Sequence, residues 1–434
     1  DTQPSYSIGC VTIDPSNPYT IWVGTGENVG GRHVGYGDGI YRSEDNGKTW
    51  KNMGLKSSEH ISKIAVHPEN SDVIWVAVQG PLWNKGGERG LYKSTDGGET
   101  WEELTAGIPN VNKGKIGLAI SPQNPDRIYA AIELRRTKGG VFMSENRGKT
   151  WVKQSDAVAG ATGPHYYQEL YASPHKEGRL YLVNNSMITS DDHFKTYRFL
   201  KRKGMHSDSH AMAFRKDDPN YLLVGTDGGL YESLDLAENW RFIDNMPITQ
   251  YYKLAVDDTE PFYNIYGGTQ DNGSHGGPSR TDNEHGIRNA DWWKTLFADG
   301  HQSAIEPGNP NITYAETQQG GLYRIDQITG EQVMVQPQPG EGEGFERFNW
   351  DAPIVVSSFD PARLYVASSR VWRSNDRGDS WEAISSDLPR DEERIALPIM
   401  GGVQSWENAW DVGAMSNYNT ITSLAESPLD ENLI

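Results

Sequence analysis

The chain has 434 residues, of which 36% are hydrophobic and 10% aromatic, and it carries a formal net charge of −19. This charge argues against a nucleic-acid partner, because nucleic-acid-binding proteins gather basic residues to neutralise phosphates. No apolar run approaches the roughly 18 residues of a membrane-spanning helix, and the single cysteine, Cys10, excludes an internal disulfide.

One short pattern recurs six times along the chain. It reads Ser-x-Asp-x-Gly-x-x-aromatic, and its first copy runs from Ser43 to Trp50 with Asp45 as its third residue. The third residues of the later copies are Asp96, Asn146, Asp192, Asp235 and Asp376. They are spaced by 51, 50, 46 and 43 residues and then by 141, which is three times 47. A period of this size predicts stacked supersecondary units.

A turn that contains proline supports the same period. The anchoring prolines are Pro15, Pro68, Pro122, Pro174, Pro219, Pro261, Pro307, Pro361 and Pro428. These nine anchors indicate eight full units and the start of a ninth, with two units that lack the box inside the long gap. Each unit contains short β-branched and aromatic runs between Gly, Pro, Asn and Asp turns, which are strand signals. The pattern predicts an all-β fold, a β-propeller of four-stranded blades.

The predicted blades fill residues 1–390, with units that start near residues 5, 58, 112, 165, 206, 249, 298 and 349. Residues 391–434 are predicted to be a linker loop and the start of a further blade. Because the chain stops inside a unit, we expect tandem propellers in a longer parent protein, although one large ring is the alternative.

The boxes are expected to be structural. The short carboxylate of Asp45 can accept hydrogen bonds from backbone N–H groups of a turn. The glycine two residues later permits a positive φ, and the aromatic residue can pack on the neighbouring blade. Asn146 keeps the acceptor without the charge, which indicates that geometry matters more than charge.

The repeated box resembles the Asp-box, or bacterial neuraminidase repeat, of sialidases, sortilin-type receptors and tandem-propeller xyloglucanases. The segments 225–229, 267–273 and 348–353 are similar to those of large secreted bacterial proteins of the sortilin-like or glycosyl-hydrolase-like kind. The resemblance implies a propeller and an extracellular, cell-surface or periplasmic location, but the families that share the box include both hydrolases and receptors. Sialidases add an Arg-Ile-Pro segment, whereas Arg394-Ile395 is followed here by Ala396, which disfavours sialidase activity.

The function is expected on the box-free face of the propeller, which we call the mouth. The first strand of each blade starts on this face, and the loop between the second and third strands opens on it, so variable loops converge there. Counting back from the prolines places polar residues at the mouth in successive units. The predicted ligand-binding residues are His165, Tyr166, Gln270, Asp271, Asp299, His301 and Trp350.

Two chemical hypotheses concern the mouth. If His206, Asp208 and His210 lie on one strand, their alternate side chains share a side and could hold a divalent ion. Imidazole nitrogens with a carboxylate suit Zn, whereas an all-oxygen set suits Ca. The alternative is that these side chains bond turn backbone and water at the rim. Separately, Asp227 and Asp351 are the best pair of carboxylates for glycoside hydrolysis, with Trp350 as a platform for a sugar.

Two classes of function follow from these residues. The first is a module that recognises a polymer, either protein or polysaccharide, through the mouth. The second is a polysaccharide-cleaving enzyme, and a glycosidase is favoured over a lyase in which His165, Tyr166 or Tyr167 would abstract a proton.

Overall fold

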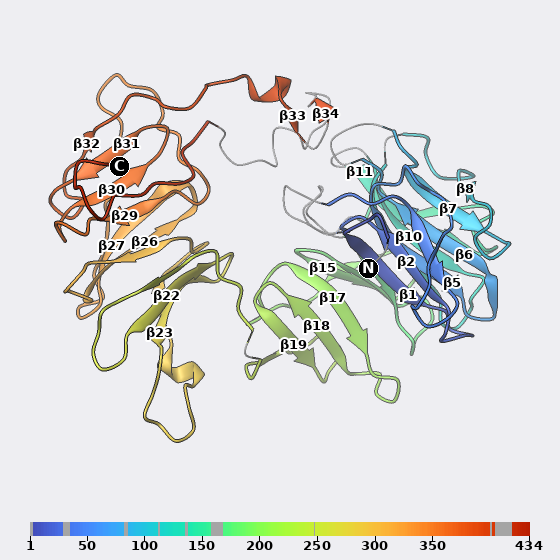
Figure 1. Ribbon diagram of the computed structural model, residues 1–434. Coiled ribbons are helices and arrows are strands. Elements are labelled where there is room, and N and C mark those ends of the chain that lie inside the picture. Colours follow the sequence, from blue (N-terminus) through green and yellow to red (C-terminus); the bar gives the residue numbers. More distant parts are fainter. Residues whose placement is uncertain are drawn as a thin grey trace. The chain divides into compact units, whose positions relative to one another are not determined.

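The computed structural model describes residues 3–28, 35–81, 86–111, 113–134, 138–157, 168–246, 248–399, 402–403 and 419–434. These residues form eight four-stranded antiparallel sheets and one two-stranded sheet, with short 3-10 turns as the described helical structure. Each four-stranded sheet joins strands that are consecutive in the sequence, which is the construction of a propeller blade (Figure 1). The predicted all-β propeller fold is therefore confirmed.

The chain divides into two compact units. Unit 1 comprises Asp1–Met246 with Ile395–Met415, and unit 2 comprises Pro247–Arg394 with Ser416–Ile434. Five of the four-stranded sheets lie in unit 1 and three in unit 2.

The strands of unit 1 are β1 (Ile8–Ile13), β2 (Ile21–Thr25), β3 (Ile40–Ser43), β4 (Lys51–Asn52), β5 (Ile61–His67), β6 (Asn70–Val78), β7 (Gly90–Ser94), β8 (Glu102–Glu103), β9 (Lys113–Ile120), β10 (Ile128–Leu134), β11 (Lys138–Ser144), β12 (Val152–Ser155), β13 (Glu169–Ala172), β14 (Leu180–Val183), β15 (Met187–Ser190), β16 (Arg198–Phe199), β17 (Ser209–Phe214), β18 (Leu222–Thr226), β19 (Gly229–Ser233), β20 (Arg241–Ile243), β33 (Pro398–Ile399) and β34 (Gly402–Val403).

The elements of unit 2 are β21 (Leu254–Val256), β22 (Asn264–Thr269), β23 (Gly273–Pro278), η1 (Asn289–Asp291), β24 (Trp293–Leu296), β25 (Ser303–Ile305), β26 (Ile312–Thr317), η2 (Gln318–Gly320), β27 (Gly321–Asp326), β28 (Gln332–Met334), β29 (Ile354–Val356), β30 (Leu364–Ala367), β31 (Val371–Ser374) and β32 (Glu382–Ala383). A third 3-10 turn, η3 (Arg394–Ala396), spans the boundary between the units.

Within each unit the first strands of successive blades are neighbours. In unit 1 the contacts run from β1 to β5, β9, β13 and β17 in turn, and in unit 2 from β21 to β25 and β29. The hydrophobic core lies between the blades. One cluster joins Trp75 of β6 to Leu118 of β9, and another joins Tyr314 of β26 to Ile354 of β29. Burial between consecutive sheets therefore stabilises the stack.

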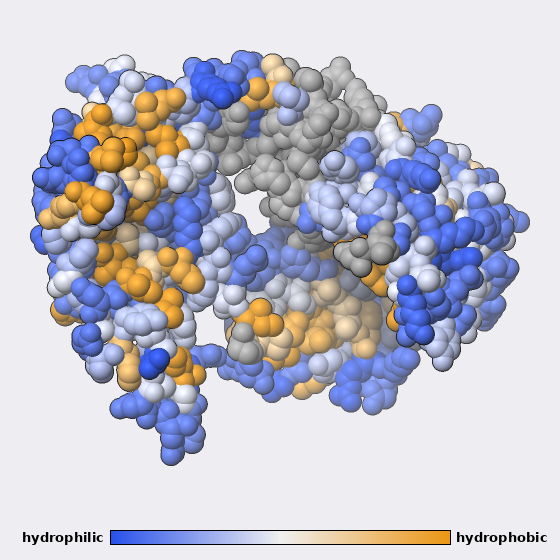
Figure 2. Space-filling model, viewed as in Figure 1, coloured by the Kyte–Doolittle hydropathy of each residue, from blue (hydrophilic) through white to orange (hydrophobic). Residues whose placement is uncertain are grey.

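The surface in Figure 2 is largely hydrophilic, in keeping with the net charge of −19, but hydrophobic residues are exposed on unit 2. Leu254 of β21 and Phe297, just after β24, are among the exposed apolar side chains of that unit.

The boxes form the turns between third and fourth strands, as predicted. In the first box, Oδ1 of Asp45 accepts hydrogen bonds from the N–H groups of Lys48 at 3.0 Å and Thr49 at 2.8 Å. The serine has a role that the sequence analysis missed, since Oγ of Ser43 accepts the N–H of Gly47 at 2.8 Å. Gly47 has a φ of 84°, which suits glycine.

Two boxes hold the same left-handed backbone without glycine. Phe194 and Ala237 occupy the glycine position with φ values of 64° and 68°, and their N–H groups still donate to Ser190 and Ser233 at 2.8 Å. The hydrogen bond to the serine therefore accompanies this conformation with or without glycine.

Residues 419–434 lie along the last blade of unit 2. The N–H of Ile421 donates to the carbonyl of Ser368 at 2.8 Å, and Glu426 accepts a hydrogen bond from Ser357 at 2.7 Å. This segment contains no strand, and the start of a ninth blade remains a prediction.

Candidate functional site

Three first strands of unit 2 begin at neighbouring points and bring charged side chains together. Lys253 precedes β21, His301 precedes β25 and Asp351 precedes β29. Nζ of Lys253 lies 3.0 Å from Oδ2 of Asp351, and Nδ1 of His301 lies 3.9 Å from Oδ1 of the same aspartate. The expected convergence of strand starts thus unites two of the predicted residues, His301 and Asp351, with a lysine that the sequence analysis did not single out.

Aromatic side chains enclose His301. The ring of Tyr252 stacks on the imidazole with centroids 4.7 Å apart, and Trp350 meets it edge-on at 5.7 Å. The histidine is fully buried, and neither ring nitrogen has a hydrogen-bond partner among the described residues. Burial lowers the pKa of His301 below its ordinary value, against the attraction of Asp351 and Asp299, so the ring is neutral at pH 7. Tyr252 remains 45% exposed and offers a surface to a ligand.

The β22–β23 turn adds amides and carboxylates to the same mouth. The Tyr252 hydroxyl donates to Oε1 of Gln270. The N–H of Asp271, whose φ is 61°, donates to Oδ1 of Asp299 at 2.8 Å, and Oδ2 of Asp299 accepts from Gln318. The structure therefore links Gln270, Asp271 and Asp299, which were predicted separately as ligand-binding residues.

Glu316 is the second residue that the sequence analysis missed. It lies on β26, is fully buried, and its Oε1 accepts the N–H of Gln302 at 3.4 Å. Burial, together with the adjacent carboxylate of Asp351, raises its pKa well above the ordinary value. The available signal was a carboxylate that follows Tyr314 and Ala315 inside a second strand.

The His206, Asp208 and His210 side chains do not form the predicted strand ladder. Strand β17 begins at Ser209, Asp208 has a left-handed φ of 56°, and a bulge separates Ser209 from Ala211. The premise that the three side chains alternate on one strand is therefore wrong, because a left-handed residue and a bulge each break the period of two.

The three predicted metal ligands also point to different partners. Nδ1 of His206 lies 2.8 Å from the carbonyl of Ser207, and Nε2 of His210 pairs with Asp227. Among the residues that the structure describes, His206, Asp208 and His210 do not bring three ligand atoms within 4.8 Å of one another. A metal held by this triplet does not fit the arrangement.

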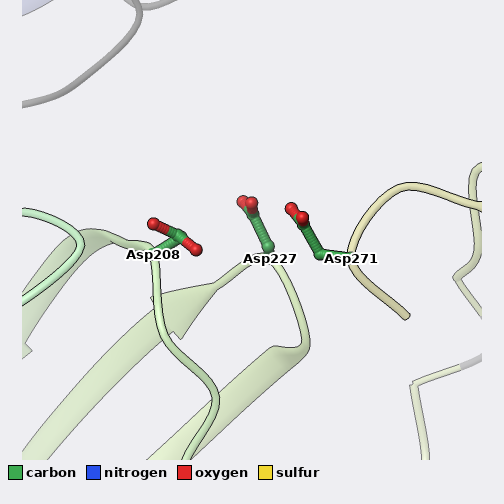
Figure 3. A group of neighbouring side chains, drawn as sticks. All are labelled: Asp208, Asp227 and Asp271. Atoms are coloured by element: carbon green, nitrogen blue, oxygen red, sulfur yellow. The ribbon is translucent and has the colours of Figure 1, made fainter. Parts of the chain in front are cut away.

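Figure 3 shows Asp208 just before β17 and Asp227 just after β18, in one blade of unit 1. Asp271, which is also labelled there, belongs to unit 2. The predicted catalytic pair is likewise divided, with Asp227 in unit 1 and Asp351 in unit 2. His165, Tyr166 and Tyr167 lie outside the described residues.

Comparisons with known proteins relate the chain to two groups. The family model for Sortilin-Vps10 (sortilin, neurotensin receptor 3) matches residues 38–160. An oligoxyloglucan reducing end-specific xyloglucanase of Emericella nidulans is 23% identical over an alignment of 359 residues, and the match covers 75% of this chain and 40% of that protein. The vacuolar protein sorting/targeting protein 10 of Aspergillus flavus is 22% identical over an alignment of 264 residues, and the match covers 57% of this chain and 17% of that protein.

Among solved structures, a xyloglucanase from Xanthomonas campestris matches 88% of this chain and 65% of that chain, with 14% identity and a TM-score of 0.47. The chain spans less than half the length of the two curated relatives. No helix in the described part of the chain is long and apolar enough to cross a membrane.

Proposed function

We propose that this chain, an Asp-box β-propeller protein similar to the Sortilin-Vps10 family and to xyloglucanases, binds a polysaccharide through the mouth of unit 2 outside the cytoplasm. The observation that carries the proposal is the partly exposed ring of Tyr252 beside Trp350, bordered by Gln270 and Asp271. Sugar rings present apolar C–H faces to aromatic rings and hydroxyls to planar polar groups, and this mouth offers both.

The choice of a polysaccharide over a protein ligand has a further support. The xyloglucanase similarity covers 75% of this chain, whereas the Vps10 similarity covers 57%. A protein ligand remains the alternative that the binding experiment decides.

The test is binding of the intact protein to a panel of plant and algal polysaccharides by affinity electrophoresis and calorimetry. Tyr252→Ala and Trp350→Ala should each weaken binding roughly tenfold or more, since loss of one stacking platform costs about 1–3 kcal/mol. Tyr263→Ala is the matched control, because Tyr263 is 48% exposed but precedes β22, away from the strand starts that form the mouth. The proposal would be refuted if the polysaccharide slowed the migration of all three variants equally in the gel, or if it did not slow the parent protein.

Cleavage of the bound glycan is the second candidate function. It is favoured by the position of Asp351, which is half-buried beside Lys253 and the buried Glu316, because glycoside hydrolysis uses two carboxyl groups that flank the scissile bond. A reducing-end assay on the same panel, with Asp351→Ala and Asp227→Ala beside the parent, tests it. Turnover that is lost in either variant would establish an enzyme, and binding without turnover would leave a recognition module.

A further inference from the structure

The turn at residues 427–433 repeats the first turn of the last blade of unit 2. That first turn joins β29 to β30, and it is closed by the N–H of Ser357, which donates to the carbonyl of Arg363 at 2.9 Å. The N–H of Ser427 donates to the carbonyl of Leu433 at 2.8 Å in the same way. The same bond closes the turn between the first and second strands of four other blades, where the donors are Asp14, Ser121, Ser173 and Glu306. Residues 427–433 therefore have the backbone of a turn between a first and a second strand.

A side-chain hydrogen bond inside the turn is repeated as well. Oδ1 of Asp360 accepts the N–H of Ala362 at 3.0 Å, and Oδ1 of Asp430 accepts the N–H of Asn432 at 3.0 Å. A short carboxylate that accepts the N–H two residues later is an Asx turn. Aspartates at the two corresponding positions thus fix the same local conformation, and the agreement between the turns has its origin in the sequence.

The residues before this turn dock on the last blade as a first strand docks on the blade before it. The N–H of Ile421 donates to the carbonyl of Ser368, the residue after β30, at 2.8 Å. The N–H of Ser209, which begins β17, donates to the carbonyl of Asn184, the residue after β14, at 3.1 Å. In both cases the start of one segment meets the end of the second strand of the preceding blade.

Two glutamates hold the segment along the last blade, beside which the C-terminal end lies in Figure 1. Glu426 accepts the hydroxyl of Ser357 at 2.7 Å and the N–H of Ser358 at 2.9 Å. Glu431 pairs with Arg363 at 3.0 Å. The segment is therefore bound to the blade over the length of a first strand and its turn.

The register of the last blade identifies the edge on which a second strand would lie. In an antiparallel strand every other N–H points to the same neighbour, so Ser357 and Val355 both direct their N–H groups to β30. Ser427 corresponds to Ser357, and the N–H groups that point to the equivalent edge therefore belong to Ala425 and Ser423. Both residues are exposed, and no described residue accepts a hydrogen bond from either N–H.

We propose that residues 421–434 are the first strand and first turn of a further blade, and that the edge formed by Ser423 and Ala425 binds an extended apolar segment of a partner as an antiparallel second strand. Unpaired N–H and C=O groups of an edge strand are a template for such pairing. The bound segment is apolar because a second strand is covered on both of its faces, as β30 (Leu364–Ala367) is buried along its whole length. This inference does not depend on the proposed function.

The blade start is tested by hydrogen exchange of the intact protein, followed by NMR. The N–H groups of Ile421 and Ser427 should be protected at least about tenfold more strongly than those of the edge, because they donate to carbonyls of the fold. Glu426→Ala should lower the protection of Ile421, since it removes a contact with the last blade, whereas Ser423→Ala, at an exposed position, should preserve it. An unprotected Ile421 or Ser427 in the parent protein would overturn the blade start.

The edge is tested by adding a synthetic peptide with the sequence of residues 362–368, which contain β30. At saturation the N–H groups of Ser423 and Ala425 should exchange at least about tenfold more slowly than without the peptide. Unchanged exchange at both positions would contradict the binding of a strand. If both were already protected without peptide and light scattering showed a dimer, the occupant would be a second copy of this chain and the assignment to a partner segment would be wrong.

Two N-methylated peptides serve as matched controls. The N–H of Ala367 donates to the carbonyl of Pro353 at 3.2 Å, so the N–H of Tyr365 also faces the first strand and that of Val366 faces away from it. The peptide methylated at the tyrosine nitrogen should therefore lose the effect, and the peptide methylated at the valine nitrogen should keep it. Equal protection by the two methylated peptides would show contact without strand pairing and would overturn the proposed edge.

Discussion

Replacing Ser94 with alanine should destabilise unit 1, because a buried backbone N–H would lose its acceptor. Ser94 ends β7 and is 1% exposed. Its Oγ accepts the N–H of the buried Gly98 at 2.8 Å and that of Asp96 at 3.2 Å, and donates to Oδ1 of Asp96 at 2.7 Å. An unsatisfied buried N–H costs about 1–3 kcal/mol, and the alanine methyl group offers nothing in exchange.

The expected shift follows from the size of the unit. With an unfolding entropy of about 2.1 cal/mol/K per residue over roughly 250 residues, a loss of about 2 kcal/mol lowers the melting temperature by roughly 4 °C. Differential scanning calorimetry of the whole protein would resolve this shift if unit 1 melts cooperatively.

Two variants serve as controls for Ser94→Ala. Thr95→Ala removes a hydroxyl from the adjacent residue, which is exposed, and should leave the melting temperature near that of the parent. Asp96→Asn should also be mild, because Asn146 of the third box accepts the N–H of Thr150 at 2.9 Å and donates to its hydroxyl at 2.8 Å. If Ser94→Ala had the same melting temperature as Thr95→Ala, the role given to the serine hydroxyl would be wrong.

Three further predictions concern titratable groups of unit 1 whose pKa is shifted by desolvation. Burial lowers the pKa of His60 from 6.5 to about 4, so the unfolded chain takes up a proton at a higher pH than the folded chain. The free energy of unfolding of unit 1 should therefore fall by about 3 kcal/mol between pH 6.5 and pH 4. In His60→Gln, the denaturant midpoint should fall less over the same pH range. Burial lowers the pKa of Lys115 from 10.5 to about 8, so the free energy of unfolding should rise by about 3 kcal/mol between pH 8 and 10.5. The denaturant midpoint of Lys115→Met should lack this rise. Cys10 is half-buried, and desolvation raises the pKa of its thiol to about 12. A thiol reagent at pH 8 should therefore react much more slowly with the folded than with the unfolded protein, and equal rates would contradict this.

The fold could be predicted from the sequence because its information is local and repeated. The box turn is closed by bonds within seven residues, from Ser43 to Thr49, so each copy reports the same β3–β4 type of turn without knowledge of its neighbours. The same local character explains why the starts of the first strands in unit 2 could be placed from the sequence. The position of His301 and Asp351 at strand starts follows from the repeat register alone.

The geometry at His206, Asp208 and His210 could not be predicted in this way, because contacts with other segments set it. The N–H of Asp208 donates to Asn185 of the preceding blade, and its carbonyl accepts from Asp227 at 3.1 Å. These bonds accompany the left-handed backbone and the bulge that follows. An alternating pattern of polar residues predicts a shared side only where the ladder continues, and here β17 starts one residue after the aspartate.

The two residues missed at the mouth, Lys253 and Glu316, belong to an arrangement that both units share. Each unit places a buried carboxylate on a second strand, Glu133 on β10 and Glu316 on β26, and each has a lysine that attracts it from a first strand or just before one, Lys115 in unit 1 and Lys253 in unit 2.

The surroundings of the two lysines differ in a way that bears on function. In unit 1 the carbonyl of Asn28 accepts Nζ of Lys115 at 3.0 Å and the amide of Gln79 at 3.2 Å, while the Asn28 amide reaches Glu169 at 3.0 Å. The polar groups there bond to one another through a single loop residue. In unit 2, Tyr252, which precedes Lys253, its partner Gln270 and the adjacent Asp271 stay exposed. Since a ligand needs groups that are held in place yet still accessible, the arrangement in unit 2 is the one through which we propose that a ligand binds.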